Sequence, residues 1–333
     1  MTASPTSLLD RRLLLFTGKG GVGKTTLVSA LALEAAARGR RPLVVELGHR
    51  SSLESVFDVD AIGYTPREVG RGVHAMNLDF ESALAEYFEE HIPVKRVART
   101  INRNKTLQKF FHAAPSVPEV ATLNKLSALE AERGPDGGPR WDPIFVDLDA
   151  TGHALMLLNL PSVMNGLIGD GPMRRLVDGF STLLTDPRRT ILSLVTLPLE
   201  LPAQETVELH QELVRHHEVA LGCLFVNQVP PRPLTPKQAG MLDRLEHKSR
   251  EVGIATLIDD VAIARRAMRY HANARGQINR MLRDIDMPMV ELPLVPGRAL
   301  TLDTVATIGR RTGALLDAGE QREETNVGPV PHR

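Results

Sequence analysis

The sequence contains one cysteine, Cys223, among its 333 residues. A single cysteine excludes an intramolecular disulfide, and it excludes a zinc site built mainly from thiolates of this chain. Because Cys223 lies within the apolar run 220–226, we expect it to be a buried and inert thiol.

The sequence also lacks net charge, since lysine plus arginine and aspartate plus glutamate number 40 each. This balance gives no electrostatic reason to expect nucleic acid or an anionic membrane as the main partner. The longest apolar stretch, 154–169, contains Pro161 and is short for a membrane span, and residues 1–12 lack the apolar core of a signal peptide. We therefore expect a cytoplasmic protein without stable membrane insertion.

Short apolar runs alternate with helical patterns along the chain. A run at 12–17, a helical pattern from Lys24 to Gly39 and a second run at 41–47 form a strand–helix–strand unit, which requires parallel strands. Further strands are expected at 73–79, 143–149, 190–196, 220–226 and 289–295. The pattern predicts an α/β fold with a doubly wound, mostly parallel sheet.

The domain organisation is predicted from the same pattern. Residues 12–317 are expected to form a single domain, with a helical insertion at about 80–132. Residues 1–11 are predicted to be a flexible leader. The polar segment 318–333 is predicted to be a disordered tail.

A glycine-rich segment joins the first predicted strand to the first predicted helix. Residues 18–25, GKGGVGKT, match the phosphate-binding loop G-x-x-x-x-G-K-[ST]. In such a loop, converging backbone N–H groups and the positive end of the next helix dipole hold phosphates. The nucleotide-binding residues expected here are Gly18, Gly20, Gly21, Val22, Gly23, Lys24, Thr25 and Thr26.

Three of these side chains have distinct expected tasks. Lys24 should reach the β- and γ-phosphates as a point charge, and the Thr25 hydroxyl should bind Mg²⁺. Thr26 is expected to contact a nearer phosphate. The alternative is a simple glycine turn with lysines nearby, which would not need to lie between a strand and a helix.

The early lysine, Lys19, distinguishes this loop from ordinary phosphate-binding loops. The segment resembles the deviant K-G-G-x-G-K-T/S class of dimeric P-loop ATPases. The resemblance implies that Lys19 is catalytic, reaching the nucleotide of a partner subunit and neutralising charge on the transferred phosphoryl group. The alternative is a solvated surface lysine.

A second motif, FVDLDATGH at 145–153, resembles the D-x-x-P-T-G-H switch of the ArsA-like family of arsenite-efflux and tail-anchored-protein-targeting ATPases. The resemblance implies a P-loop NTPase fold with ATP and Mg²⁺ as cofactors. It implies that Asp147 binds the Mg²⁺ shell or orders water, and that the Gly152 N–H meets the γ-phosphate. It also implies that Asn227 reads adenine with its amide.

The sequence departs from the family in the segment after its second strand. The family places a water-activating aspartate there, and alignment on Leu53 and Phe57 puts Gly48 at that position. We therefore expect slow hydrolysis, with Glu46 or His49 as candidate substitutes; Glu46 lies two residues earlier, on a strand that can face the other way. One cysteine cannot trap arsenite as several thiolates do, and there is no C-x-x-C zinc clamp.

The function predicted is that of a dimer-forming ATPase that couples ATP binding and slow hydrolysis to conformational change and to handling of a client. A hydrophobic membrane-protein segment is one candidate client, held by helices at 80–130 and 154–185; ordinary core packing of these helices is the alternative. The dimer is a homodimer, or the chain is a hydrolysis-poor subunit paired with a paralogous ATPase. A positioning ATPase of septa or plasmids is a third alternative.

Overall fold

An eight-stranded sheet forms the centre of the computed structural model, which describes residues 8–48, 52–91, 117–148, 151–165, 170–252, 255–295 and 300–326. The strand order is β3-β4-β2-β5-β1-β6-β7-β8, and only β3 runs antiparallel to its neighbour. The strands are β1 (Leu13–Thr17), β2 (Leu43–Leu47), β3 (Arg67–Gly70), β4 (Val73–Leu78), β5 (Ile144–Asp147), β6 (Thr190–Thr196), β7 (Leu221–Val229) and β8 (Met289–Pro293).

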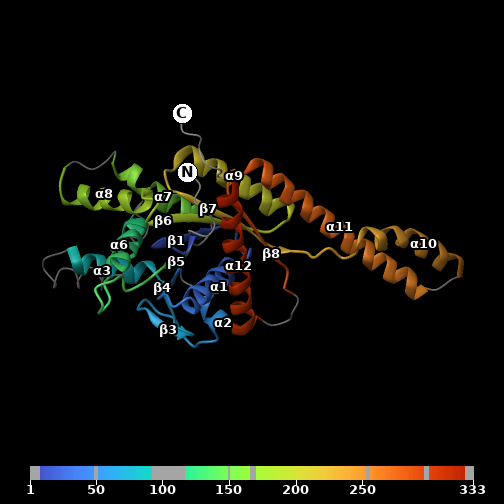
Figure 1. The fold of residues 1–333 in the computed structure, drawn as a ribbon. Helices are drawn as coiled ribbons and strands as arrows, with labels where there is room; N and C mark the ends of the chain where they lie inside the picture. The colour runs from blue at the N-terminus through green and yellow to red at the C-terminus, as the bar shows by residue number, and fades with distance from the viewer. Residues whose placement is uncertain are drawn as a thin grey trace.

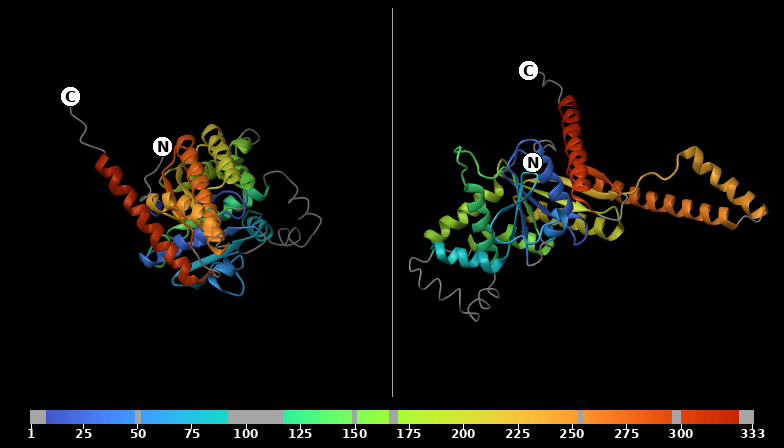
Figure 2. Two further views of the ribbon diagram at one scale, coloured as in Figure 1. Left: turned by 90° about the vertical axis from the view of Figure 1, so that its right-hand side faces the viewer. Right: turned by 90° about the horizontal axis from the view of Figure 1, so that it is seen from below.

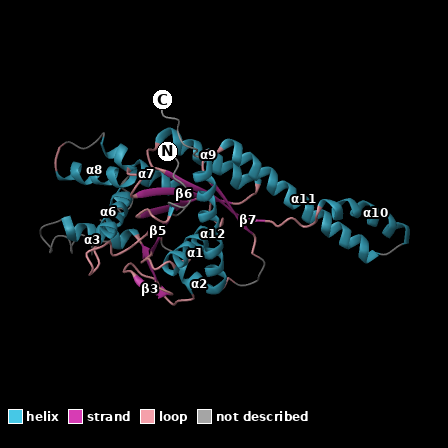
Figure 3. Ribbon diagram, viewed as in Figure 1, coloured by secondary structure: helices cyan, strands magenta, loops and turns pink. Residues whose placement is uncertain are grey.

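Helices cover both faces of the sheet (Figures 1 and 3). One face carries α1 (Lys24–Ala37), α2 (Leu53–Phe57) and α12 (Leu302–Asn326). The other face carries α6 (Val117–Ala131), α7 (Thr151–Asn165), α8 (Pro172–Thr185) and α9 (Glu200–His216), with α3 (Phe80–His91) beside α6. The predicted doubly wound, mostly parallel sheet is confirmed.

The central strand β1 is buried on both sides, which explains its continuous apolar sequence. Leu13 and Leu15 enter the core beneath α6 to α9, whereas Leu14 and Phe16 enter the core beneath α1 and α12. The same alternation continues in β2 and β5 and decides which side chains reach the α1 face at the carboxyl ends of those strands.

Two helices leave the sheet and form an arm, α10 (Pro236–Val252) with α11 (Ala255–Asp284), which projects away from the rest of the molecule (Figure 2). Arg265 of α11 binds Asp243 and Glu246 of α10, with nitrogen–oxygen distances of 2.6 Å to each carboxylate. At the foot of the arm, Ile278 and Met281 join the core beneath α9. The predicted charged helical section is thus a two-helix hairpin.

The chain ends differ from the sequence prediction. Leu8 and Leu9 are buried in the core of the α1 face, so this part of segment 1–11 packs on the domain instead of forming a loose leader. The last helix continues past Asp317 to Asn326, into the segment predicted to be disordered. The sequence pattern also gave no sign of α2 or β3, which are five and four residues long.

The predicted helical insertion is described only in part. Helices α3 and α6 lie within its predicted bounds, and the residues between them, 92–116, lie outside the described residues. Among the helices that the structure describes, none combines the length and apolarity needed to cross a bilayer.

Candidate functional site

The glycine-rich loop follows β1 directly and ends where α1 begins at Lys24. The Lys24 ammonium folds back over the loop and donates hydrogen bonds to the carbonyl oxygens of Gly18, at 2.9 Å, and of Lys19, at 3.3 Å. The loop thus lies at the amino terminus of α1 with its lysine folded over it, and the positive end of a helix attracts phosphate.

Thr25 and Asp147 meet at the carboxyl end of the sheet. The Thr25 hydroxyl donates a hydrogen bond to Oδ2 of Asp147, a side chain that ends β5 and is 4% exposed. A hydroxyl and a carboxylate oxygen at the edge of a phosphate-binding loop are ligands that Mg²⁺ accepts. Within the described residues, no cluster of three or more histidine, cysteine, aspartate or glutamate side chains could hold a metal ion.

These groups open onto a cavity that we name the phosphate-side cavity. Its lining is predominantly polar and combines the loop, the ends of β2 and β5, and the start of α2. The lining residues are Gly20, Gly21, Lys24, Thr25, Glu46, Leu47, Gly48, Ser52, Asp147 and Leu148.

Glu46 faces this cavity, which settles the orientation that the sequence left open. It is the register partner of Asp147 across β2 and β5, so both side chains point to the α1 face of the sheet. Glu46 is 5% exposed. Its carboxylate accepts the backbone N–H of Ser52 at 2.9 Å and that of Leu53 at 3.4 Å, at the amino terminus of α2.

The position predicted to lack a carboxylate is a backbone turn. Gly48 has a φ of 116°, a conformation that residues with a side chain rarely adopt. Gly48 still lines the phosphate-side cavity. His49, the other candidate substitute, lies outside the described residues.

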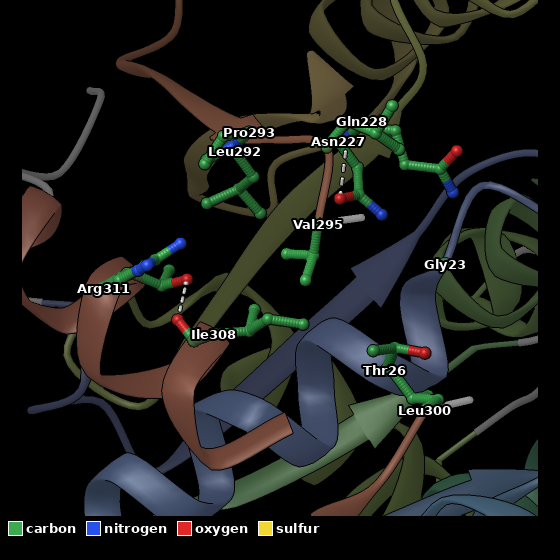
Figure 4. A pocket seen from close by; sticks show the side chains of 12 residues that line it. Gly23, Thr26, Asn227, Gln228, Leu292, Pro293, Val295, Leu300, Ile308 and Arg311 are labelled. Atoms are coloured by element: carbon green, nitrogen blue, oxygen red, sulfur yellow. Dashed lines mark hydrogen bonds between the residues drawn. The ribbon is translucent and has the colours of Figure 1, made fainter. Parts of the chain in front are cut away.

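A second cavity, the base-side pocket, adjoins the far end of the loop (Figure 4). Its lining is largely apolar and comes from the loop, the end of β7, the segment after β8, and α12. The lining residues are Gly23, Thr26, Asn227, Gln228, Leu292, Pro293, Leu294, Val295, Leu300, Ile308, Arg311 and Thr312.

Asn227 joins the base-side pocket to the glycine-rich loop. Its Nδ2 donates to the carbonyl oxygen of Val22 at 2.9 Å, and its Oδ1 accepts the backbone N–H of Gln228 at 2.9 Å. A Cβ atom on Gly23 would lie 2.5 Å from Nδ2 of Asn227, so only glycine permits this approach. The amide keeps one further N–H and one lone pair for a ligand in the pocket.

Thr26, Gly152 and Lys19 are among the predicted site residues that do not line the phosphate-side cavity. Thr26 lines the base-side pocket instead. Gly152 is exposed in the first turn of α7, beyond residues 149–150, which lie outside the described residues. Lys19 forms an ion pair with Glu205 of α9, and these side chains are 40% and 41% exposed.

Several residues of the site were not found by the sequence interpretation. Ser52 is the N-cap residue before α2, and Ile308, Arg311 and Thr312 come from α12. Their distance from any motif explains the omission. Strand alternation puts Glu46 on the same side of β2 as Val44, but the sequence alone does not say that this side faces α1 and Asp147.

Comparisons with known proteins identify relatives that are described as ATPases. A family model described as anion-transporting ATPase matches residues 11–178. ATPase BagA of Mycobacterium tuberculosis is 29% identical over 306 residues, which cover 87% of this chain and 89% of that protein. An arsenical pump-driving ATPase of Acidiphilium multivorum is 32% identical over 242 residues, covering 66% of this chain and 39% of that protein.

Proposed function

The chain belongs to the anion-transporting ATPase family, and from this premise we propose that it binds ATP as its magnesium complex and hydrolyses it slowly. Membership makes the chain an ATP-binding ATPase; the residue roles, the magnesium requirement and the rate belong to the proposal. The observation that carries it is the Thr25–Asp147 contact beside the glycine-rich loop.

Three groups of residues would bind the phosphates, the metal ion and the adenine, each according to its chemistry. The loop N–H groups and Lys24 would bind the β- and γ-phosphates, with the ammonium leaving the two carbonyl oxygens that it contacts here. Thr25 and Asp147 would hold Mg²⁺, which supplies charge neutralisation between the phosphates. Asn227 and the apolar lining of the base-side pocket would hold the adenine.

Replacement of the metal-facing carboxylate tests this proposal. In Asp147→Asn, the oxygen that contacts Thr25 remains but the negative charge is lost, so we expect weaker Mg²⁺ binding and a fall in turnover of about 100-fold. ATP turnover over a magnesium titration measures both effects, and Asp178→Asn on the exposed side of α8 is the matched control. Unchanged magnesium dependence in Asp147→Asn would contradict the proposed metal site.

We include a dimer in the proposal, with Lys19 acting on the nucleotide of the partner. This is supported by the exposure of Lys19 and by its position outside the lining of the phosphate-side cavity of its own subunit. Light scattering with and without ATP and Mg²⁺ tests it. A monomer under every condition would remove the action of Lys19 in trans.

A second candidate function, favoured by Gly48, is that of a hydrolysis-poor subunit that pairs with a paralogous ATPase. The position lacks a carboxylate and its φ of 116° suits glycine alone. Turnover of the chain alone, compared with turnover after addition of a paralogue that retains the aspartate, distinguishes the two functions. Equal rates would count against the heterodimer.

The proposal also includes the handling of an apolar client, for which α7 offers an exposed surface. On α7, Met156 and Val163 are 51% and 49% exposed and lie on one side of the helix, seven residues apart. Fluorescence anisotropy with a labelled apolar helical peptide tests this surface. Equal affinity of wild type and Met156→Lys would exclude it as the contact.

A further inference from the structure

The phosphate-side cavity holds two carboxylates, and only one of them is accounted for by the metal site. Among the lining residues, Glu46 and Asp147 are the acidic ones. Asp147 contacts Thr25. Glu46 lies one strand farther from the loop, at the same level of the sheet, so it borders the part of the cavity between the phosphate loop and α2.

The carboxylate of Glu46 is held in place by backbone groups. The N–H groups of Ser52 and Leu53 donate to it at 2.9 and 3.4 Å. Two backbone donors fix the orientation of the group in the cavity. An ionised carboxylate offers about four acceptor sites, so about two remain for other donors.

The backbone at Gly48 explains why the carboxylate comes from Glu46. A side chain at Gly48 would have to adopt a φ of 116°, a conformation that residues other than glycine rarely adopt because it strains the backbone. Glu46 has the longer acidic side chain and starts two residues earlier, on a strand whose register already points it to the α1 face. The cavity thus receives its second carboxylate without a strained residue.

We infer that Glu46 is a catalytic residue that binds and deprotonates the attacking water; this inference rests on the proposed function. The oxygen of water forms a bond to the γ-phosphorus while the bond from that phosphorus to the β–γ bridging oxygen breaks. The bond electrons remain on ADP. The proton of water passes to the Glu46 carboxylate and then to the released inorganic phosphate, which restores the carboxylate.

Glu46→Gln is the decisive variant, because it keeps the size of the side chain and one oxygen for the Ser52 N–H. We expect kcat for ATP to fall about 100-fold, the usual scale for loss of a general base. KM, the affinity for a fluorescent ATP analogue and the thermal unfolding midpoint should stay close to those of wild type. Glu46→Asp keeps a carboxylate and should retain more of the rate than Glu46→Gln.

Glu54→Gln is the matched control, since Glu54 caps the N–H of Ile62 at 3.0 Å from the same helix α2 and does not line the cavity. An unchanged kcat in Glu46→Gln overturns the inference. So does a loss of rate matched by an equal loss of analogue affinity or of unfolding temperature, since that pattern belongs to a purely structural cap. Wild type that neither binds nor hydrolyses ATP overturns the proposed function itself, which separates the two failures.

Discussion

The phosphate-side cavity and the base-side pocket differ in how the chain builds them. The first is polar and combines a continuous loop with the ends of two strands and the start of α2. The second is largely apolar and combines the end of the loop with β7 and with the segment that runs from β8 into α12, three parts that lie far apart in the sequence. Charged phosphates are held by oriented N–H groups and a lysine, whereas a base is held mostly by burial.

Because the two cavities differ in this way, substitutions in one should have different kinetic consequences from substitutions in the other. Changes in the phosphate-side cavity should act on groups that stabilise the transferring phosphoryl group, so they should lower kcat. Changes in the base-side pocket should remove binding that is equal in the ground state and the transition state, so they should raise KM.

The largest effect is expected from Lys24→Ala. The ammonium that now contacts the carbonyl oxygens of Gly18 and Lys19 is removed, and no other loop side chain that lines the phosphate-side cavity is cationic. ATP turnover should fall by at least about 100-fold. A coupled assay of ADP release measures it, with Lys237→Ala on the exposed start of α10 as the control.

A Lys24→Ala protein that hydrolyses ATP at the wild-type rate would contradict the prediction that the phosphate-side cavity carries the groups needed for hydrolysis. It would mean that the polar cavity does not hold the reacting phosphate. The control should keep the wild-type rate, because Lys237 lines neither cavity.

Asn227→Ala is expected to have an effect of intermediate size, and this effect should be a higher KM for ATP. The variant loses the hydrogen bond to Val22 and the amide that faces the base-side pocket. Loss of a hydrogen bond of about 1 kcal/mol, or somewhat more, raises KM for ATP by about 5- to 30-fold. The preference for ATP over GTP should also narrow, as competition between the two nucleotides would show.

The exposed Asn273→Ala on α11 serves as the control for this measurement. A fall in kcat with unchanged KM would contradict the prediction that substitutions in the base-side pocket act on KM. It would place Asn227 with the chemistry, through its bond to the loop, instead of with the base.

The smallest effect is expected from Glu205→Gln. The ion pair of Glu205 with Lys19 joins two partly exposed side chains, and such pairs contribute about 0.2–1 kcal/mol. If Lys19 must leave this pair to reach a partner subunit, turnover should rise by at most about fivefold. The change should be clearest at low protein concentration, where formation of the proposed dimer would limit the rate.

Glu208→Gln, on an exposed position of the same helix, is the matched control. A rate that stays constant in Glu205→Gln at every protein concentration would show that this pair does not restrain Lys19. The lysine would then be a surface residue, as the alternative interpretation of the sequence allowed.

The sequence predicted the parts of the site that come from short continuous motifs. The loop at 18–25 and the strand-end Asp147 were found because each belongs to a short motif placed between a strand and a helix. The ion pair of Lys19 with Glu205 could not be found in this way, since α9 follows the loop by more than 170 residues. The same holds for the contribution of α12 to the base-side pocket.

The alternation of buried strands with helices and the phosphate loop can be predicted from the sequence, because both arise from neighbouring residues. That Glu46 faces the same cavity as Asp147 is known only from the three-dimensional fold, because it depends on the register of β2 against β5. The same is true of the meeting of Asn227 with the loop at Gly23. Contacts between distant segments follow from the packing of the whole sheet, and no local pattern encodes them.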